Sequence, residues 1–282
     1  MLHPIVFDRR LLRARRARAA ALGPATFLLD RVAGDIAERL SAVLRTFDIA
    51  LDLGTPADAV RRAIADRVGT IAAVTADEEA LPFRDGSLDL VVSALTLQYV
   101  NDLPGTLIQI RRALKPDGLF LAAMIGGDSL AELRAAFAEA EAEVEGGVSP
   151  RVAPFADLRD LGALLQRAGF ALPVTDVDRV MVRYGSPLAL MHDLRRMGAG
   201  NVLTARRRTP LRRSTLQRVL EIYSERFADP DGRIRATFEI VWLSGWAPHE
   251  SQQQPLKPGS ARMRLADALR TQEISTGEKA GE

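Results

Sequence analysis

The sequence contains no cysteine and only three histidines, His3, His192 and His249. The first absence excludes disulfides, thiolate metal ligands and a cysteine nucleophile. The histidines are far apart and show no HExxH-type spacing, so no metal site is expected. A chain without disulfides suits a reducing compartment, and we expect a bacterial cytoplasm.

Long apolar runs are also missing. No stretch of about 18 apolar residues exists, so no membrane span is expected. The amino terminus is rich in arginine and poor in acids, as in a mitochondrial transit peptide. Because Phe27, Leu28 and Leu29 follow in a helical pattern, we favour a helix of the mature protein at this end.

Charge of the two signs is nearly balanced, and a formal net charge of +2 gives no argument for nucleic acid. Six arginines nevertheless fall between Arg9 and Arg18, and five between Arg206 and Arg213. Neither cluster has the interleaved aromatic side chains that stack on bases. Such clusters are either solvated helix faces or sites for phosphates, anionic lipid or an acidic partner, and the basic helix 9–18 is the candidate docking surface for an acidic partner.

What is present is an alternation of buried-type apolar runs and amphipathic stretches. It predicts an α/β fold, with a mostly parallel sheet and helices on both faces. The expected strands and extended segments are 47–53, 70–75, 88–93, 119–125, 174–184 and 234–246. The expected helices are 9–22, 24–44, 56–68, 104–114, 129–144, 158–168, 187–197, 214–227 and 263–269. Gly69 should close the third helix and residues 116–118 should form a turn.

Polar or glycine residues follow three of the expected strands. They are Asp52 to Gly54, Ala76 to Glu78, and Ser93. In open α/β sheets, ligands bind outside the carboxyl ends of the strands. We therefore expect the functional site at this edge of the sheet.

The run Leu51-Asp52-Leu53-Gly54 and the segment 76–127, which begins ADEEALPFRDGSLDLVV and includes LKPDG, resemble the class I S-adenosylmethionine (SAM)-dependent methyltransferase superfamily. Three further segments are similar to one family within it, that of the mitochondrial complex I assembly factor that hydroxylates an arginine, with its bacterial relatives. These segments are EGGVSPRVAPF (145–155), DLGALLQRAGF (160–170) and GWAPHES (245–251). The similarity covers residues 7 to 265, and a weaker one links the chain to the malonyl-carrier-protein methyltransferases.

The resemblance implies one methyltransferase-like domain at 1–265 with a seven-stranded, Rossmann-like sheet whose last pair is antiparallel. Within it, N-terminal helices (1–45) precede a cofactor half (46–127) and a C-terminal half (128–250). A flexible tail would follow at 266–282. The resemblance further implies a protein substrate, with a complex I subunit as the candidate, and the mitochondrial matrix if the protein is eukaryotic.

The family also implies residues for SAM. In such sites one acid holds the ribose hydroxyls, another reads the adenine, and glycines let the backbone approach the cofactor. The matching cofactor-binding positions here are Asp52, Gly54, Asp77, Glu78 and Ser93. The weaker substrate candidates are Gln98 and His249; no catalytic residue is identified, and each of these side chains also has a structural interpretation.

Two departures from the family pattern bear on the cofactor. The first loop reads Asp52-Leu53-Gly54-Thr55-Pro56 where the family has Asp-x-Gly-x-Gly-x-Gly, and proline brings a bulky ring without an N–H. The interval from Gly54 to Asp77 also holds one strand–helix unit fewer than the family has. We therefore predict that strand 70–75 lies directly beside strand 47–53, with Asp77 or Glu78 replacing the lost ribose acid.

Three functions remain open at this point. The first is a SAM-dependent methyltransferase-like protein that modifies a protein or a small carrier substrate. The second is a catalytically inactive assembly factor or binding module with a degenerate SAM loop. The third, protein-arginine hydroxylation, follows from the resemblance alone.

Overall fold

The computed structural model describes residues 5–74, 77–253, 263 and 265–272. It divides into two units, Met1–Pro248 and His249–Glu282, and the sheet lies in the first. The second unit contains the short helix α9 (Leu265–Leu269), which begins two residues later than expected. No described helix is long and apolar enough to cross a membrane. Of the flexible tail expected at 266–282, residues 273–282 lie outside the described residues.

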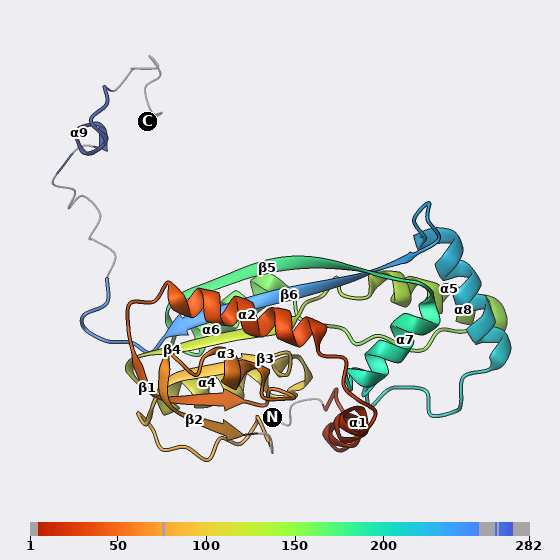
Figure 1. Cartoon of the computed structure of the whole chain (residues 1–282), viewed down its shortest axis with the longest axis horizontal. Helices are drawn as coiled ribbons and strands as arrows, with labels where there is room; N and C mark the ends of the chain where they lie inside the picture. The colour runs from red at the N-terminus through yellow and green to blue at the C-terminus, as the bar shows by residue number, and fades with distance from the viewer. Residues whose placement is uncertain (1–4, 75–76, 254–262, 264, 273–282) are drawn as a thin grey trace, which may run out of the picture. The chain divides into compact units, whose positions relative to one another are not determined.

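A six-stranded sheet in the order β2-β1-β3-β4-β6-β5 forms the centre of the first unit (Figure 1). Strands β1 to β4 pair in parallel, whereas β6 is antiparallel to both β4 and β5. The predicted α/β class and the antiparallel final pair are thus confirmed. The strands are β1 (Phe47–Leu53), β2 (Val68–Val74), β3 (Leu88–Ala94), β4 (Leu114–Ile125), β5 (Ala171–Tyr184) and β6 (Ile234–Trp246).

Strand β2 lies directly beside β1, with Leu51 opposite Ala72. The prediction that strand 70–75 takes the place next to the first strand is confirmed, although Thr75 itself is not described. One crossover through the short helix α3 (Ala59–Ala63) explains the pairing, because a single such connection places consecutive parallel strands side by side. The expectation of seven strands is wrong: the described part of the sheet has six, as the missing strand–helix unit requires.

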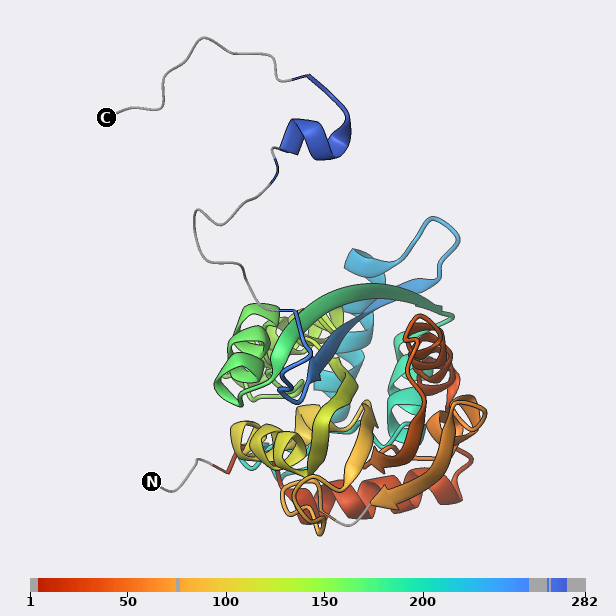
Figure 2. The same ribbon diagram turned by 90° about the vertical axis from the view of Figure 1, so that its left-hand side faces the viewer.

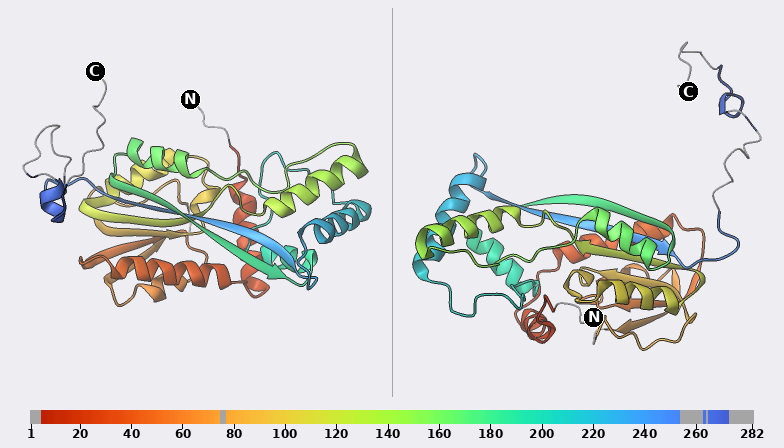
Figure 3. Two further views of the ribbon diagram at one scale, coloured as in Figure 1. Left: turned by 90° about the horizontal axis from the view of Figure 1, so that it is seen from above. Right: turned by 180° about the vertical axis from the view of Figure 1, so that it is seen from behind.

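Different helices cover the two faces of the sheet (Figure 3). Helix α2 (Phe27–Ser41) lies with α3 on one face, and α4 (Leu103–Ala113) lies with α6 (Leu158–Arg167) on the other. Each of the longer helices has its buried apolar residues three or four positions apart, which makes one apolar stripe per helix. The core therefore has two layers, one on each side of the strands.

Strands β5 and β6 extend side by side toward a group of helices at one end of the sheet (Figure 1). These helices are α5 (Ala131–Glu145), α7 (Pro187–Arg196) and α8 (Arg213–Phe227). Helix α1 (Arg9–Ala21) lies beyond the carboxyl ends of β1 and β3, and Figure 2 shows it lengthwise in red. The arginine-rich helix thus reaches the edge at which the sequence predicts a ligand.

The expected helix 56–68 is wrong, since only Ala59–Ala63 is helical. Arg67 turns back toward the end of α2, where its Nη2 atom donates to two backbone carbonyl oxygens at 3.1 and 2.8 Å. Gly69 does not close a helix but lies inside β2. A Cβ atom there would be 2.9 Å from the carbonyl oxygen of Asp48, so close strand pairing explains the glycine.

The expected turn at 116–118 is also wrong, because these residues form an irregularity inside β4. Asp117 has a φ angle of 62°, as a turn residue would. Its N–H donates to the carbonyl oxygen of Ala247, however, and the N–H of Ala247 donates to Gly118. These hydrogen bonds to the segment after β6 keep residues 116–118 within the sheet.

The second helix begins at Phe27 rather than at residue 24. The residues before it are engaged elsewhere: the N–H of Ala25 donates to the carbonyl oxygen of Arg196, and Arg196 Nε donates to the carbonyl oxygen of Gly23. This segment therefore ties the start of α2 to the end of α7. Strand β4 begins at Leu114, five residues before the predicted strand 119–125, and the remaining helices and strands match their predicted positions to within three residues.

Candidate functional site

Asp52, at the carboxyl end of β1, is almost completely buried. Its Oδ2 atom lies 2.9 Å from Nη1 of Arg61, on the crossover helix α3. Burial raises the pKa of Asp52, and this effect outweighs the opposing contributions of Thr55 and Arg61. The acid of the first motif is therefore ion-paired within the chain.

Glu78 lies against Gly54, the remaining glycine of the first loop. Gly54 has a φ angle of 72°, in the region that favours glycine, and a Cβ atom there would be 2.6 Å from Glu78 Oε1. Thr96, which follows β3, donates its hydroxyl to the same oxygen at 3.1 Å. The structure thus brings a carboxylate to the place beside the loop where the predicted replacement for the ribose acid should lie.

Two arginines of α1 bind this carboxylate. Arg9 pairs with Oε2 of Glu78, and Arg16 Nη1 lies 3.5 Å from Oε1. Arg16 also donates to the Thr96 hydroxyl at 2.6 Å, and Arg9 donates to the carbonyl oxygen of Tyr99 at 3.2 Å. The side chain of Glu78 is only 3% exposed. We name this group, Arg9, Arg16, Glu78 and Thr96, the arginine–glutamate cluster.

The sequence interpretation did not include this cluster. A signal for it exists, since Arg9 and Arg16 are seven residues apart and so lie on one face of a helix. What the sequence does not show is that this face meets an acid 62 to 69 positions later in the chain. At least two arginines of the basic helix therefore have an acidic partner within their own chain.

The other predicted site residues have local roles. Asp77 is half-exposed, accepts from the N–H of Glu79 at 3.1 Å and lies 3.4 Å from Arg9. Ser93 is buried and donates to the carbonyl oxygen of Leu53 at 2.8 Å. His249 belongs to the second unit, where its Nδ1 atom is 2.7 Å from the hydroxyl of Ser251.

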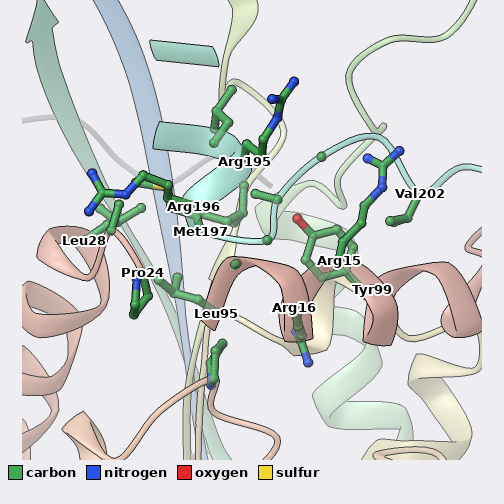
Figure 4. A pocket seen from close by; sticks show the side chains of 18 of the residues that line it. Arg15, Arg16, Pro24, Leu28, Leu95, Tyr99, Arg195, Arg196, Met197 and Val202 are labelled. Carbon is green, nitrogen blue, oxygen red and sulfur yellow. The ribbon is translucent and has the colours of Figure 1, made fainter. Parts of the chain in front are cut away.

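A cavity of about 990 Å³ opens beside the cluster, within the first unit (Figure 4). Its wall is formed by α1, the start of α2, the end of α7, and the residues that follow β1, β3 and β4. Pro56, Leu95 and Gln98 come from these strand ends, and Gln98 is the only predicted site residue in the lining. Gln98 donates its side-chain amide to the carbonyl oxygen of Leu95 at 2.9 Å. Arg16 belongs both to the cavity wall and to the arginine–glutamate cluster, so the cluster borders the cavity at this residue.

The residues in this arrangement do not fit SAM. Both carboxylate oxygens of Glu78 are already bound, Asp52 is paired with Arg61 through Oδ2, and, among the described residues, the side chains of Glu78 and Thr96 fill the space in front of Gly54. Glu78 and Asp52 are therefore engaged by protein groups, Asp77 is half-exposed beside Arg9, and none of the three lines the cavity. Among the described residues, no group of three or more His, Asp or Glu side chains is placed to hold a metal ion.

Replacing Gly54 with alanine tests how tightly this loop is packed. We expect the free energy of unfolding to fall by about 2 kcal/mol, because the new Cβ meets Glu78 and Thr96 and the φ angle is unfavourable for alanine. Urea unfolding measures the change. Gly86→Ala is the matched control: its φ angle is 65°, but nothing lies within 4 Å of the added atom. Equal losses in the two variants would show that packing against Glu78 contributes nothing.

Comparisons with known proteins agree with the methyltransferase-like fold. Residues 33–122 match the family model described as a methyltransferase domain. A solved structure of a putative methyltransferase from Bacillus halodurans superposes with a TM-score of 0.52 at 17% identity, over 76% of this chain and 98% of that one, which shows the fold alone.

Sequence relatives extend over nearly the whole chain. The mitochondrial arginine-hydroxylase NDUFAF5 of Danio rerio is 39% identical over 93% of this chain and 89% of its own length. The human protein of the same name is 40% identical over 93% and 83%. A malonyl-[acyl-carrier protein] O-methyltransferase of Laribacter hongkongensis is 40% identical over 67% of this chain and 61% of its own length. This chain therefore belongs to the NDUFAF5 family, within the class I methyltransferase superfamily.

Proposed function

We propose that this chain is a methyltransferase-like assembly factor that acts on a protein partner, a subunit of respiratory complex I. The observation behind the proposal is the arginine–glutamate cluster. In this proposal, the paired Glu78 is not free to hold the adenosine of a cofactor, while the neighbouring cavity stays open. The near full-length similarity to NDUFAF5 supports a role of the same kind. The mitochondrial names of these relatives favour the matrix in eukaryotes, and the bacterial cytoplasm stays a prediction.

SAM-dependent modification of a protein or a small carrier is the second candidate. One observation favours it: Glu78 lies beside Gly54, where an acid could hold ribose hydroxyls once Arg9 and Arg16 release it. Titration calorimetry with SAM and S-adenosylhomocysteine distinguishes the candidates. For the wild type we expect no binding up to millimolar ligand. Micromolar binding that is lost in Glu78→Gln would replace the first candidate with the second.

Removing the arginines tests whether the cluster blocks a competent site. The double variant Arg9→Gln/Arg16→Gln should remain unable to bind SAM if the loop is degenerate, because Pro56 and the short crossover persist. Binding by the double variant alone would show a SAM site that α1 covers, and would favour the second candidate. A second experiment tests the assembly role. In cells that lack the chain, native gels should show a smaller amount of assembled complex I, and the wild-type gene should restore that amount. An unchanged amount of assembled complex I would contradict the assembly role.

Arginine hydroxylation, the activity in the relatives' name, is a third candidate. The cavity gives no support for a substrate guanidinium inside it. Six arginines and no aspartate or glutamate stand in the wall formed by the described residues. Like charges in a partly desolvated space repel, so a cationic side chain would not enter. Hydroxylation would therefore have to occur outside this cavity.

A further inference from the structure

The charged side chains of the cavity wall are all positive among the described residues. The six arginines that line it come from α1, from the segment after α5 and from α7, and the described lining contains no acid to balance them. They are Arg15, Arg16, Arg18, Arg151, Arg195 and Arg196. A cavity with such a wall attracts anions.

Three of the six arginines form ion pairs with acids that do not line the cavity. Arg16 pairs with Glu78, Arg151 pairs with the buried Glu141 at 2.5 Å, and Arg196 lies 3.5 Å from Asp193. These ion pairs occupy their guanidinium groups and give them a structural explanation. They do not by themselves call for a ligand.

The other three arginines have no such partner. Among the described residues, neither an ion pair nor a side-chain hydrogen bond engages Arg15, Arg18 or Arg195. Burial lowers the pKa of Arg15, and the nearby positive charges of Arg206, Arg18 and Arg195 lower it further. Cations gathered in this way repel each other, and an anion among them would relieve the repulsion.

Arg15 lies against the loop that follows α7. A Cβ atom on Gly200, in this loop, would meet the Arg15 guanidinium, so the two groups are in close contact. In Figure 4, Arg15 and Arg195 extend to the same side of α1, whereas Arg16 extends to the other side. Arg15 and Arg195 therefore point away from Arg16 and the arginine–glutamate cluster.

Most of the remaining wall is apolar. Leu28 from α2, Leu95 after β3 and Leu133 from α5 line it together with Phe238 from β6. A space of about 990 Å³ is at the upper end of the range for small-molecule sites, so it can hold an apolar body as well as a charged group.

We propose that this cavity binds a small amphiphilic oxyanion. Its carboxylate or phosphate group would be held by Arg15, Arg18 and Arg195, and its apolar body would lie along the leucine-lined wall. A guanidinium offers two parallel N–H donors that match the geometry of both oxyanions. The inference goes beyond the proposed partner role and does not depend on it, because binding is measured on the isolated chain.

Titration calorimetry of the full chain with octanoate, octyl phosphate and octanol tests the proposal. We expect one or both anions to bind, octanol to bind at least about tenfold more weakly, and affinity to fall with added salt. Either anion supports the proposal, and the stronger one identifies the head group. Equal binding of octanol and the anions, or no binding at all, would overturn it.

Arginine variants assign the site. Arg15→Gln and Arg195→Gln should each weaken anion binding by about tenfold or more, the loss typical of one charge-assisted contact. Arg10→Gln is the matched control, because Arg10 is exposed on the same helix but lies outside the cavity wall. Urea unfolding shows whether each variant is folded. Unchanged affinity in folded Arg15→Gln and Arg195→Gln would refute the site even if octanoate binds.

Discussion

Replacing Glu78 with alanine is expected to lower the free energy of unfolding by about 3 kcal/mol at pH 7. The carboxylate is buried, and it is the shared partner of Arg9 and Arg16, whose side chains are only 14% and 20% exposed. Removing it leaves two poorly solvated cations whose remaining acidic neighbour in the cluster region is the half-exposed Asp77, 3.4 Å from Arg9. Such a loss exceeds that of a surface ion pair several-fold.

The same variant should loosen α1. Arg9 and Arg16 connect this helix to the segments after β2 and β3, so limited proteolysis within α1 should become faster. Asp85→Ala is the control, since the pair of Asp85 and Arg112 is more than half exposed and should contribute less than about 1 kcal/mol. A Glu78→Ala variant as stable and as protease-resistant as this control would refute the structural role of the cluster.

Replacing Glu141 with alanine is expected to have an effect of similar size, about 3 kcal/mol. Its side chain is fully buried in α5 and binds the following loop: it accepts from the N–H of Ser149 at 2.7 Å and from Arg151 Nε at 2.7 Å. Without it, Arg151 and the backbone of this loop lose their buried partner. Glu143→Ala is the matched control on the same helix, because its pair with Arg218 is exposed and should contribute little.

Glu141 also predicts a pH dependence. Burial raises its pKa, but the hydrogen bonds from Ser149 and Arg151 outweigh burial and hold the pKa below the ordinary value of 4.5. The stabilisation is therefore fully present above pH 4.5 and is lost as the pH falls through the lower pKa of the folded state. In urea unfolding, the difference between the wild type and Glu141→Ala should be constant from pH 5 to 7 and shrink toward pH 3. A difference that grows on acidification would contradict the assignment.

Much of the fold follows from local patterns. Apolar runs and helical periodicity locate the strands and most helices, and one short connection after β1 is enough to place β2 beside it. The errors arise where contacts distant in sequence override local preference. The residues before Arg67 favour a longer helix, but Arg67 binds the end of α2 instead. The residues around Asp117 favour a turn, but the hydrogen bond to Ala247 keeps Asp117 in a strand.

The site was less predictable than the fold. Motif matching identified Asp52, Gly54 and Glu78, and the structure brings Glu78 and Gly54 into contact. It did not show that Arg9 binds Glu78, because a side-chain ion pair across 69 positions leaves no periodic trace. The cavity depends on the approach of α1 to α7, and neither helix alone reveals that their arginines meet.

The shortened connection after β1 leaves β2 at the outer edge of the sheet. The other edge, β5, has charged side chains such as Asp176, Asp178 and Arg179, which oppose the addition of a further strand. β2 reads VGTIAAV and has no charge at all. Its backbone is therefore the more permissive template for strand addition, so self-association at high concentration should begin there. A lysine introduced at Ala73 would make the chain easier to keep monomeric in solution.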